Sequence, residues 1–368
     1  MLIIRQRWEQ RVWTKRGEGA FGARAVRSPL WMLSGLYRAG LAARSALYAR
    51  GWLTRTRAPA KVIVAGNLTV GGTGKTPLAC WIARQLSLRG LKTAVILRGY
   101  KGAAGKGPLV VSEGGGALLA AAVAGDEAVL LAKKLAGVPV VAGKDRAAAA
   151  RLAIARFGSS HLVLDDGFQH WPLERDMDIL VMNGQQDPER EYLLPRGPLR
   201  EPITAAARAH ALVITGAPED GKPGFAWMDR ICPDLPVFAT SYRPLGLSSI
   251  RGGKISPMGL PSLAFCGIGF PEGFFSSLEN SGVPVVAKLA FPDHHRYTAL
   301  DLLKLAAKAR EQGAKRLVTT EKDAVKIADG WGDDFPVDVL RVELDFRGGE
   351  GRFLDLILSL AGEDGDAA

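Results

Sequence analysis

The sequence predicts an α/β fold in which a mostly parallel sheet is flanked by helices, with a second, smaller α/β domain and an N-terminal amphipathic helix. Short apolar runs alternate with segments of helical periodicity, which is typical of parallel sheets covered on both faces. One of these runs leads through a glycine-rich turn into a helical pattern. A stretch rich in proline and glycine at 216–235 separates two series of runs. At 368 residues the chain is also longer than most single cores.

The apolar runs place the strands and helices in order. In the first domain, at 56–240, we expect strands at 62–66, 93–97, 109–112, 138–142, 162–165, 178–182 and 211–215. We expect helices there at 77–89, 126–136 and 145–157. The second domain, at 241–368, has apolar runs at 262–267, 284–290, 316–320 and 337–344 and a helical pattern at 298–311. We place the boundary near 217–245 and expect a frayed acidic tail at 361–368.

The net charge of the chain is concentrated at its N-terminus. Residues 1–60 hold twelve Arg or Lys and two Glu, and so account for nearly all of the formal charge of +11. Such an arm favours a polyanionic partner, either nucleic acid or an anionic membrane. Because residues 61–368 are nearly neutral, we expect no nucleic-acid partner. The three cysteines are far apart, which predicts neither a disulfide framework nor a zinc site and favours a reducing compartment.

Within the N-terminal segment 1–55, residues 29–52 have the pattern of an amphipathic helix. Met32, Leu33 and Leu36 begin an apolar stripe, and Trp31 and Trp52 add rings suited to a membrane surface. No uncharged apolar run reaches the roughly 18 residues that a transmembrane helix needs. The pattern favours a peripheral, monotopic contact with an anionic membrane. A helix packed on the body of the protein is the alternative.

The glycine-rich turn has the context of a phosphate-binding loop, with a strand before it and a helix after it. Its glycines would let backbone N–H groups approach phosphate oxygens, Lys75 would reach the terminal phosphates, and the Thr76 hydroxyl would bind Mg²⁺. The strict motif has glycine at position 69, where this chain has Thr69. An ordinary glycine-rich turn is the alternative. The expected nucleotide-binding residues are Thr69, Val70, Gly71, Gly72, Thr73, Gly74, Lys75 and Thr76.

Two further segments follow predicted strands of the first domain. Asp165 and Asp166 end the strand at 162–165, where a phosphate-loop protein holds its Mg²⁺, and Gln169 follows closely. A solvated turn is the alternative. The proline-rich loop at 194–202 presents Arg200 and Glu201, and an arginine there could neutralise transition-state charge. A solvated loop is the alternative for this segment.

Candidate proton-transfer groups lie outside the phosphate loop. Asp126 begins a predicted helix, where it could be a base or simply the N-cap. His294 and His295 follow Asp293 before the helix at 298–311, and a histidine beside a carboxylate can carry a proton. Helix capping by Asp293 is the competing explanation. The segment 319–323 could touch nucleotide or cap a helix.

Taken together, these motifs closely resemble the tetraacyldisaccharide 4′-kinase family of lipid A assembly. The resemblance covers about residues 29–330, and its order and spacing are specific. Thr69 in place of glycine is itself the family's form. The matching segments are 66–77, 98–100, 125–127, 143–146, 165–170, 197–202, 291–295 and 319–323.

The resemblance implies a P-loop kinase that transfers the γ-phosphate of ATP to the 4′-hydroxyl of tetraacyldisaccharide 1-phosphate. It implies ATP and Mg²⁺ as cofactors, a lipid substrate, and a peripheral location at the cytoplasmic face of the inner membrane. It places the catalytic pair on Asp126 and on His294 or His295, of which we favour His294, with Arg200 nearby. The implied metal groups are Thr76, Asp165, Asp166, Gln169 and Glu201. A P-loop NTPase acting as a switch or assembly factor is the competing hypothesis.

Overall fold

The structure of the protein, a computed structural model, describes residues 21–99, 107–216, 225–252, 255–327, 331 and 335–361. The chain forms two compact units. Unit 1 contains the described residues of Met1–Arg98, Asp145–Ser241 and Phe346–Ala368, and unit 2 contains those of Gly99–Lys144 and Tyr242–Asp345. Some features considered above lie outside the described residues: the basic residues before 21, Tyr100, the turn residues 217–224 and the acidic residues after 361.

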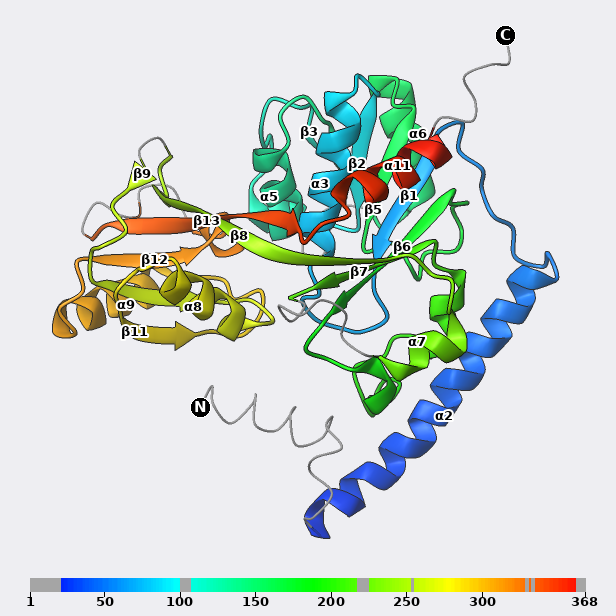
Figure 1. Cartoon of the computed structure of the whole chain (residues 1–368), viewed down its shortest axis with the longest axis horizontal. Coiled ribbons are helices and arrows are strands. Elements are labelled where there is room, and N and C mark those ends of the chain that lie inside the picture. Colours follow the sequence, from blue (N-terminus) through cyan, green and yellow to red (C-terminus); the bar gives the residue numbers. More distant parts are fainter. Residues whose placement is uncertain are drawn as a thin grey trace. The chain divides into compact units, whose positions relative to one another are not determined.

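Unit 1 is built on a parallel sheet in the order β8–β7–β6–β1–β5–β2 (Figure 1). All five pairings are parallel. The central strand β1 has five buried residues of six, which explains why its sequence is a continuous apolar run rather than an alternating one. The strands are β1 (Lys61–Gly66), β2 (Thr93–Leu97), β5 (His161–Asp165), β6 (Met177–Asn183), β7 (Ala211–Thr215) and β8 (Val237–Ser249), which continues into unit 2.

Helices and short 3₁₀ turns connect these strands. A buried cluster around Phe168 and Trp227 forms part of the core of this unit. Gly66, the last residue of β1, allows close packing there, because a Cβ at this position would lie 2.4 Å from Phe168 Cβ. The helical elements are α2 (Phe21–Ala49), α3 (Lys75–Leu88), α6 (Arg146–Phe157), η2 (Pro188–Arg190), η3 (Ile203–Arg208), α7 (Ala226–Ile231) and α11 (Glu350–Ala361).

Unit 2 has a parallel sheet in the order β11–β10–β12–β13, and two antiparallel pairs, β3 with β4 and β8 with β9. Its strands are β3 (Leu109–Ser112), β4 (Val140–Ala142), β9 (Ile255–Ser256), β10 (Ser262–Cys266), β11 (Val285–Ala290), β12 (Arg316–Thr320) and β13 (Val337–Phe346). Its helices are α4 (Ala121–Ala124), α5 (Asp126–Lys134), α8 (Pro271–Asn280), α9 (Ala299–Glu311) and α10 (Glu321–Ala324).

The predicted α/β fold is confirmed, and each expected strand is present within two residues of its expected limits. Strand β8 was not expected, because Pro244 and Gly246 resemble turn residues and its burial pattern is irregular. The expected domains, 56–240 and 241–368, are continuous, whereas the two units are not. Segment 99–144 belongs with unit 2, and β13 leads back to unit 1 before α11.

Helix α2 begins at Phe21 rather than near Pro29, and polar atoms attach it to the rest of unit 1. Ser34 and Tyr37 donate hydrogen bonds of 2.9 and 2.8 Å to the carbonyls of Leu193 and Arg200. Its predicted apolar stripe lies on the surface rather than against the body of the protein. The exposed fractions are 63% for Trp31, 67% for Met32, 46% for Leu33 and 64% for Leu36. Among the described helices, none combines the length and apolar character needed to cross a bilayer.

Candidate active site

The glycine-rich turn forms a compact loop between β1 and α3. Gly71 and Gly74 have φ angles of 110° and 91°, which glycine adopts without strain. Gly74 is the N-cap of α3, so the free N–H groups and the positive end of the helix dipole lie at this loop. Lys75 folds back over the loop, with its ammonium 3.4 Å from the Gly71 carbonyl. The loop therefore has the geometry of an anion cradle.

The loop at 193–200 supports the cradle from one side. Thr69 forms a β-bridge with Leu199, and the Val70 N–H donates to the Pro198 carbonyl over 2.8 Å. The Val70 amide is thus already used within the protein. This hydrogen bond does not favour the expected binding of phosphate by the backbone N–H of Val70. The turn after Val70 remains open to a ligand.

Two carboxylates face the start of α3. The Thr76 hydroxyl donates to Asp165 Oδ2 over 2.7 Å, and the Lys75 ammonium lies 3.7 Å from Asp166 Oδ1. The parallel pairing of β1 with β5 explains this, since Ala65 and Asp165 are register partners and both strands end at the same edge. The two motifs that the sequence separates by about ninety residues are therefore brought together.

Asp166 is held by several positively charged side chains of this site. Burial would raise the pKa of its carboxyl, but the charges of Lys75 and Arg200 outweigh this and lower the pKa. Arg200 donates to Asp166 Oδ1 over 2.7 Å. Asp166 has a φ of 54°, which is unusual for a residue with a side chain, and buried Arg146 donates to its carbonyl over 3.0 Å. Arg146 was not singled out as a site residue from the sequence.

The remaining expected metal groups have other partners. Gln169 donates to the Asn67 carbonyl over 2.8 Å and accepts from Arg200 over 3.4 Å. Glu201 accepts two hydrogen bonds from Arg208, of 2.7 and 2.9 Å, so both of its oxygens are occupied. No cluster of three or more His, Cys, Asp or Glu suited to a metal occurs among the described residues. Thr76, Asp165 and Asp166 offer only oxygen donors, which fits Mg²⁺.

His170 provides a pH-dependent contribution to stability beside this site. Burial, and then the charges of Arg146 and Arg175, lower its pKa from 6.5 to about 4. A neutral histidine in the folded state stabilises the protein fully above pH 6.5, and this stabilisation is lost as the pH falls from 6.5 through 4. We expect the urea midpoint of wild type to fall between pH 7 and pH 5 by more than that of His170→Gln. Equal shifts in both proteins would contradict the assignment.

Unit 2 contains a second candidate centre, formed by Asp126 and His294. His294 Nδ1 lies 2.8 Å from Asp126 Oδ2, although the two residues are 168 positions apart. Asp126 is the first residue of α5, and Gly125, with a φ of 93°, is its N-cap. The alternative that Asp126 is merely the N-cap is therefore wrong, because Gly125 occupies the cap position, in a conformation that glycine favours.

The environment of Asp126 favours its ionised form. Burial would raise the pKa of this carboxyl, but the hydrogen bond with His294 and the charge of Lys322 lower it to about 2. The loop that carries His294 is also constrained: His294 has a φ of 59°, and its N–H donates to Asp293 Oδ1 over 2.9 Å. The fold thus holds a carboxylate and an imidazole in direct contact.

His295 has a different environment. Its ring stacks on Phe291 with centroids 4.7 Å apart, and its Nε2 lies 3.2 Å from Asp301 Oδ2. Asp301 forms a capping box with Thr298 at the start of α9. The competing explanation that Asp293 caps this helix is therefore wrong, since Thr298 does so. The contacts of His295 are those of a residue that supports a helix terminus.

Lys322 is a functional candidate that the sequence motif alone did not single out. Its ammonium lies 3.2 Å from Glu127 Oε1 and 3.5 Å from Asp293 Oδ1. Each of these acids is the neighbour in sequence of one member of the Asp126–His294 pair. Burial would lower the pKa of Lys322, but the charges of Glu127, Asp293 and Asp126 raise it. Lys322 therefore connects the two backbone segments that present the pair.

Replacing Lys322 by methionine should raise the pKa of Asp126, because the carboxyl loses a nearby positive charge. It should also lower kcat of the expected phosphoryl transfer by about ten- to a hundredfold, because the two segments that present the pair are no longer held together. The ¹³C shift of the Asp126 carboxyl against pH, together with a pH–rate profile, measures this. Lys322→Arg should restore part of the rate. Lys134→Met, which removes another partly exposed lysine of unit 2 that pairs with Glu321, is the control. A profile for Lys322→Met that superimposes on wild type would exclude the role.

Comparison with known proteins gives a consistent result. The family model described as LpxK, tetraacyldisaccharide-1-P 4′-kinase, matches residues 26–361. A tetraacyldisaccharide 4′-kinase of Syntrophus aciditrophicus is 41% identical over 326 residues, 83% of this chain and 87% of that one. One from Anaeromyxobacter sp. strain Fw109-5 is 40% identical over 364 residues, 95% and 94% of the two chains. The crystal structure of LpxK from Aquifex aeolicus in complex with ATP is 31% identical, with a TM-score of 0.74 over 91% of this chain and 99% of that one.

Proposed function

The chain belongs to the tetraacyldisaccharide-1-P 4′-kinase family, and we therefore propose that it transfers the γ-phosphate of ATP to the 4′-hydroxyl of tetraacyldisaccharide 1-phosphate in lipid A biosynthesis. The observation that carries the proposal is the contact of the phosphate loop with the acids that end β5. Thr76 lies 2.7 Å from Asp165, and Lys75 lies 3.7 Å from Asp166. This is the arrangement that phosphoryl transfer requires, since catalysis there rests on positioning and charge neutralisation.

The residues of unit 1 hold the nucleotide in this proposal. Backbone N–H groups of the turn after Val70 and the N-terminus of α3 bind phosphate oxygens, and Lys75 neutralises the terminal phosphates. Arg200, placed by its 2.7 Å contact with Asp166, supplies a second positive charge. Thr76, Asp165 and Asp166 would hold Mg²⁺, which neutralises phosphate charge when bound. We assign no metal role to Glu201, because Arg208 holds both of its oxygens.

The residues of unit 2 handle the acceptor hydroxyl. The 4′-oxygen bonds to the γ-phosphorus as the bond from that phosphorus to the bridging oxygen of ADP breaks, and the hydroxyl proton passes to Asp126. A loose transition state requires little basicity, so a carboxylate with a pKa of about 2 can orient the hydroxyl and accept its proton late. His294 holds this carboxylate in place. We assign His295 a structural role.

A P-loop NTPase that acts as a switch is the second candidate. It would use the loop of unit 1 but would not require the Asp126–His294 contact for turnover. Transfer of label from γ-labelled ATP to the disaccharide in detergent micelles separates the two hypotheses. We expect labelled lipid with wild type and His295→Ala, and little with Asp126→Ala or His294→Ala. Release of labelled inorganic phosphate without labelled lipid would overturn the kinase proposal.

We further propose that α2 contacts the membrane surface that holds the lipid substrate. The helix uses Ser34 and Tyr37 to attach to unit 1 and leaves large apolar side chains in solvent, the reverse of an ordinary surface helix. Replacing Trp31 and Leu36 by serine should lower binding to anionic vesicles by about tenfold or more, since each apolar side chain contributes about 1.5–3 kcal/mol on burial. Vesicle co-sedimentation measures this. Binding as strong as that of wild type would exclude the contact.

A further inference from the structure

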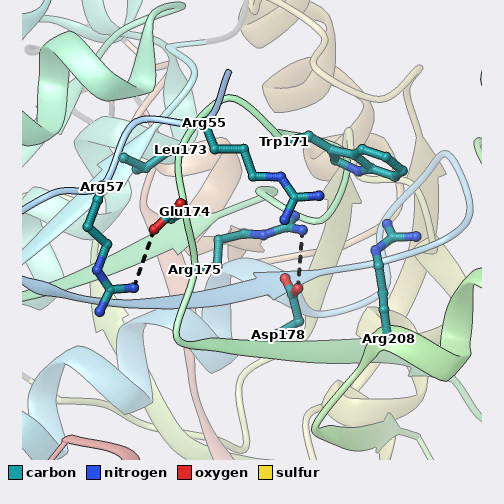
Figure 2. Close-up of a pocket in the computed structure, with 8 residues that line it drawn as sticks. All are labelled: Arg55, Arg57, Trp171, Leu173, Glu174, Arg175, Asp178 and Arg208. Atoms are coloured by element: carbon teal, nitrogen blue, oxygen red, sulfur yellow. Dashed lines mark ion pairs between the residues drawn. The ribbon is translucent and has the colours of Figure 1, made fainter. Parts of the chain in front are cut away.

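A cavity of about 330 Å³ lies in unit 1, apart from every residue that the sequence singled out as a site residue. Four segments form it: the link between α2 and β1, the loop between β5 and β6, the start of β6, and the end of η3. Four arginines from these segments line the cavity together with Trp171, and we call it the arginine pocket; the four are Arg55, Arg57, Arg175 and Arg208. Figure 2 shows Arg55, Arg175 and Arg208 reaching toward the space beneath the Trp171 ring.

The fold brings like charges together in this pocket. Burial is the main cause that lowers the pKa of Arg175, and the charges of Arg208 and Arg55 lower it further. Neighbouring guanidinium groups repel one another, and an anion bound between them would offset this repulsion. Trp171 closes the pocket as an aromatic wall, with the Arg208 guanidinium 5.5 Å from its ring centroid.

The carboxylates nearby do not use all of this positive charge. Arg57 pairs with Asp176 at 2.7 Å, and Arg208 pairs with Glu201. Arg55 makes no ion pair within the described part of the chain; its guanidinium lies over the Tyr48 ring, 5.6 Å from the centroid. Arg55 therefore offers donors to a ligand.

Asp178, which faces Arg175 at 3.4 Å, is a weak counter-charge. Burial raises the pKa of its carboxyl despite the opposing charges of Arg175 and Arg208, and so favours the neutral form. Its Oδ1 is buried and has no hydrogen-bond partner among the described residues.

We propose that the arginine pocket binds a phosphate group, with Arg55 as its principal donor. Arg175, whose Nη1 already donates to the Phe168 carbonyl over 3.0 Å, contributes positive charge. The phosphate could belong to an anionic phospholipid headgroup or be free in solution. The adjoining chain favours the headgroup: Trp52 is 72% exposed and Leu53 is 38% exposed, two or three positions before Arg55. Exposed aromatic residues beside arginines are typical of segments at an anionic membrane surface. A headgroup held here would fix the end of α2 on the bilayer.

The test compares Arg55→Gln with Arg50→Gln in the full chain. Arg50 is also an exposed arginine of the same segment but does not line the pocket, so both variants lose one positive charge. Removing one surface arginine near an anionic membrane should lower the binding affinity about fivefold. With phosphatidylcholine vesicles that contain phosphatidylglycerol, we expect Arg55→Gln to lose tenfold or more in affinity and Arg50→Gln to lose fivefold or less. Circular dichroism should show both variants folded, and transfer to micellar substrate should be unchanged.

Inorganic phosphate at constant ionic strength forms the second arm. We expect phosphate to raise the Tm of wild type and of Arg50→Gln by clearly more than that of Arg55→Gln, in which the phosphate loop is the anion site left intact. A loss in Arg55→Gln of phosphate stabilisation together with vesicle binding assigns the pocket to a lipid headgroup. A loss of phosphate stabilisation with equal vesicle binding in the two variants assigns it to free phosphate. If neither measurement separates Arg55→Gln from Arg50→Gln, the proposal is wrong.

Discussion

Replacing Asp126 by asparagine should lower kcat for transfer to the disaccharide by about 10²–10⁴-fold, the usual contribution of a general base. Asparagine keeps the size of the side chain and can still meet His294 Nδ1, which lies 2.8 Å from the carboxylate. It cannot accept the hydroxyl proton. The KM for ATP should change little, because the residues proposed to bind phosphate lie in unit 1. Initial rates at varied ATP and saturating lipid measure both quantities.

Glu127→Gln is the matched control for Asp126→Asn. Glu127 is the next residue of α5 and also a carboxylate, yet it contacts Lys322 rather than His294. We expect its kcat to fall far less than that of Asp126→Asn. A kcat for Asp126→Asn within threefold of wild type would remove Asp126 from the reaction, whatever the substrate.

The pKa of Asp126 provides an independent check of the same pair. Because the folded pKa is lowered from 3.8 to about 2, this carboxylate stabilises the folded state above pH 3.8, and that stabilisation is lost as the pH falls through 2. The hydrogen bond with His294 offsets the rise in the pKa of Asp126 that burial would cause. His294→Ala removes this bond, so the pKa of Asp126 should rise in that variant. A carboxyl titration by ¹³C NMR that is unchanged in His294→Ala would show that the contact is not formed in solution.

Local sequence patterns predicted much of the fold because the signal lies in neighbouring residues. The strand β1 is a continuous apolar run, and the turn after it contains glycines where positive φ angles occur. Strand β8 and helix α11 were not predicted for opposite reasons. The sequence of β8 contains Pro244 and Gly246, and its burial alternates irregularly. The residues of α11 directly precede the acidic tail at 361–368, and only the tail was interpreted from the sequence.

The candidate site divides in the same way. Asp165 ends β5 and Thr76 lies at the start of the helix that follows β1. Because β1 and β5 pair in parallel, the 2.7 Å contact of the two residues agrees with the mostly parallel sheet that the sequence predicted. The roles of Glu201 and Lys322 could not be read in this way. Each depends on which distant side chain reaches it, Arg208 in one case and Glu127 in the other. Tertiary packing determines such partners, and no local sequence pattern predicts them.

Replacing Phe353 by alanine should lower the free energy of unfolding of unit 1 by about 3–5 kcal/mol, the usual cost of removing a buried phenylalanine. Phe353 is fully buried on α11. Its ring lies 4.8 Å from Phe238, 5.0 Å from Phe346 and 5.6 Å from Trp81, measured between centroids. The deletion leaves a cavity bounded by three rings, which can close only if the strands or helices that carry them move. Urea unfolding followed by near-ultraviolet circular dichroism measures the loss.

The effect should extend from the core to the phosphate loop. Trp81 belongs to α3, which begins at Lys75, so α11 packs against the helix that presents the lysine proposed to bind nucleotide. We expect Phe353→Ala to raise the KM for ATP while Asp355→Ala, an exposed change on the same helix, alters stability by less than about 0.5 kcal/mol and leaves KM unchanged. An unchanged KM in a clearly destabilised Phe353→Ala would mean that α3 keeps its position without α11. The geometry of the phosphate loop would then depend on β1 and the 193–200 loop alone.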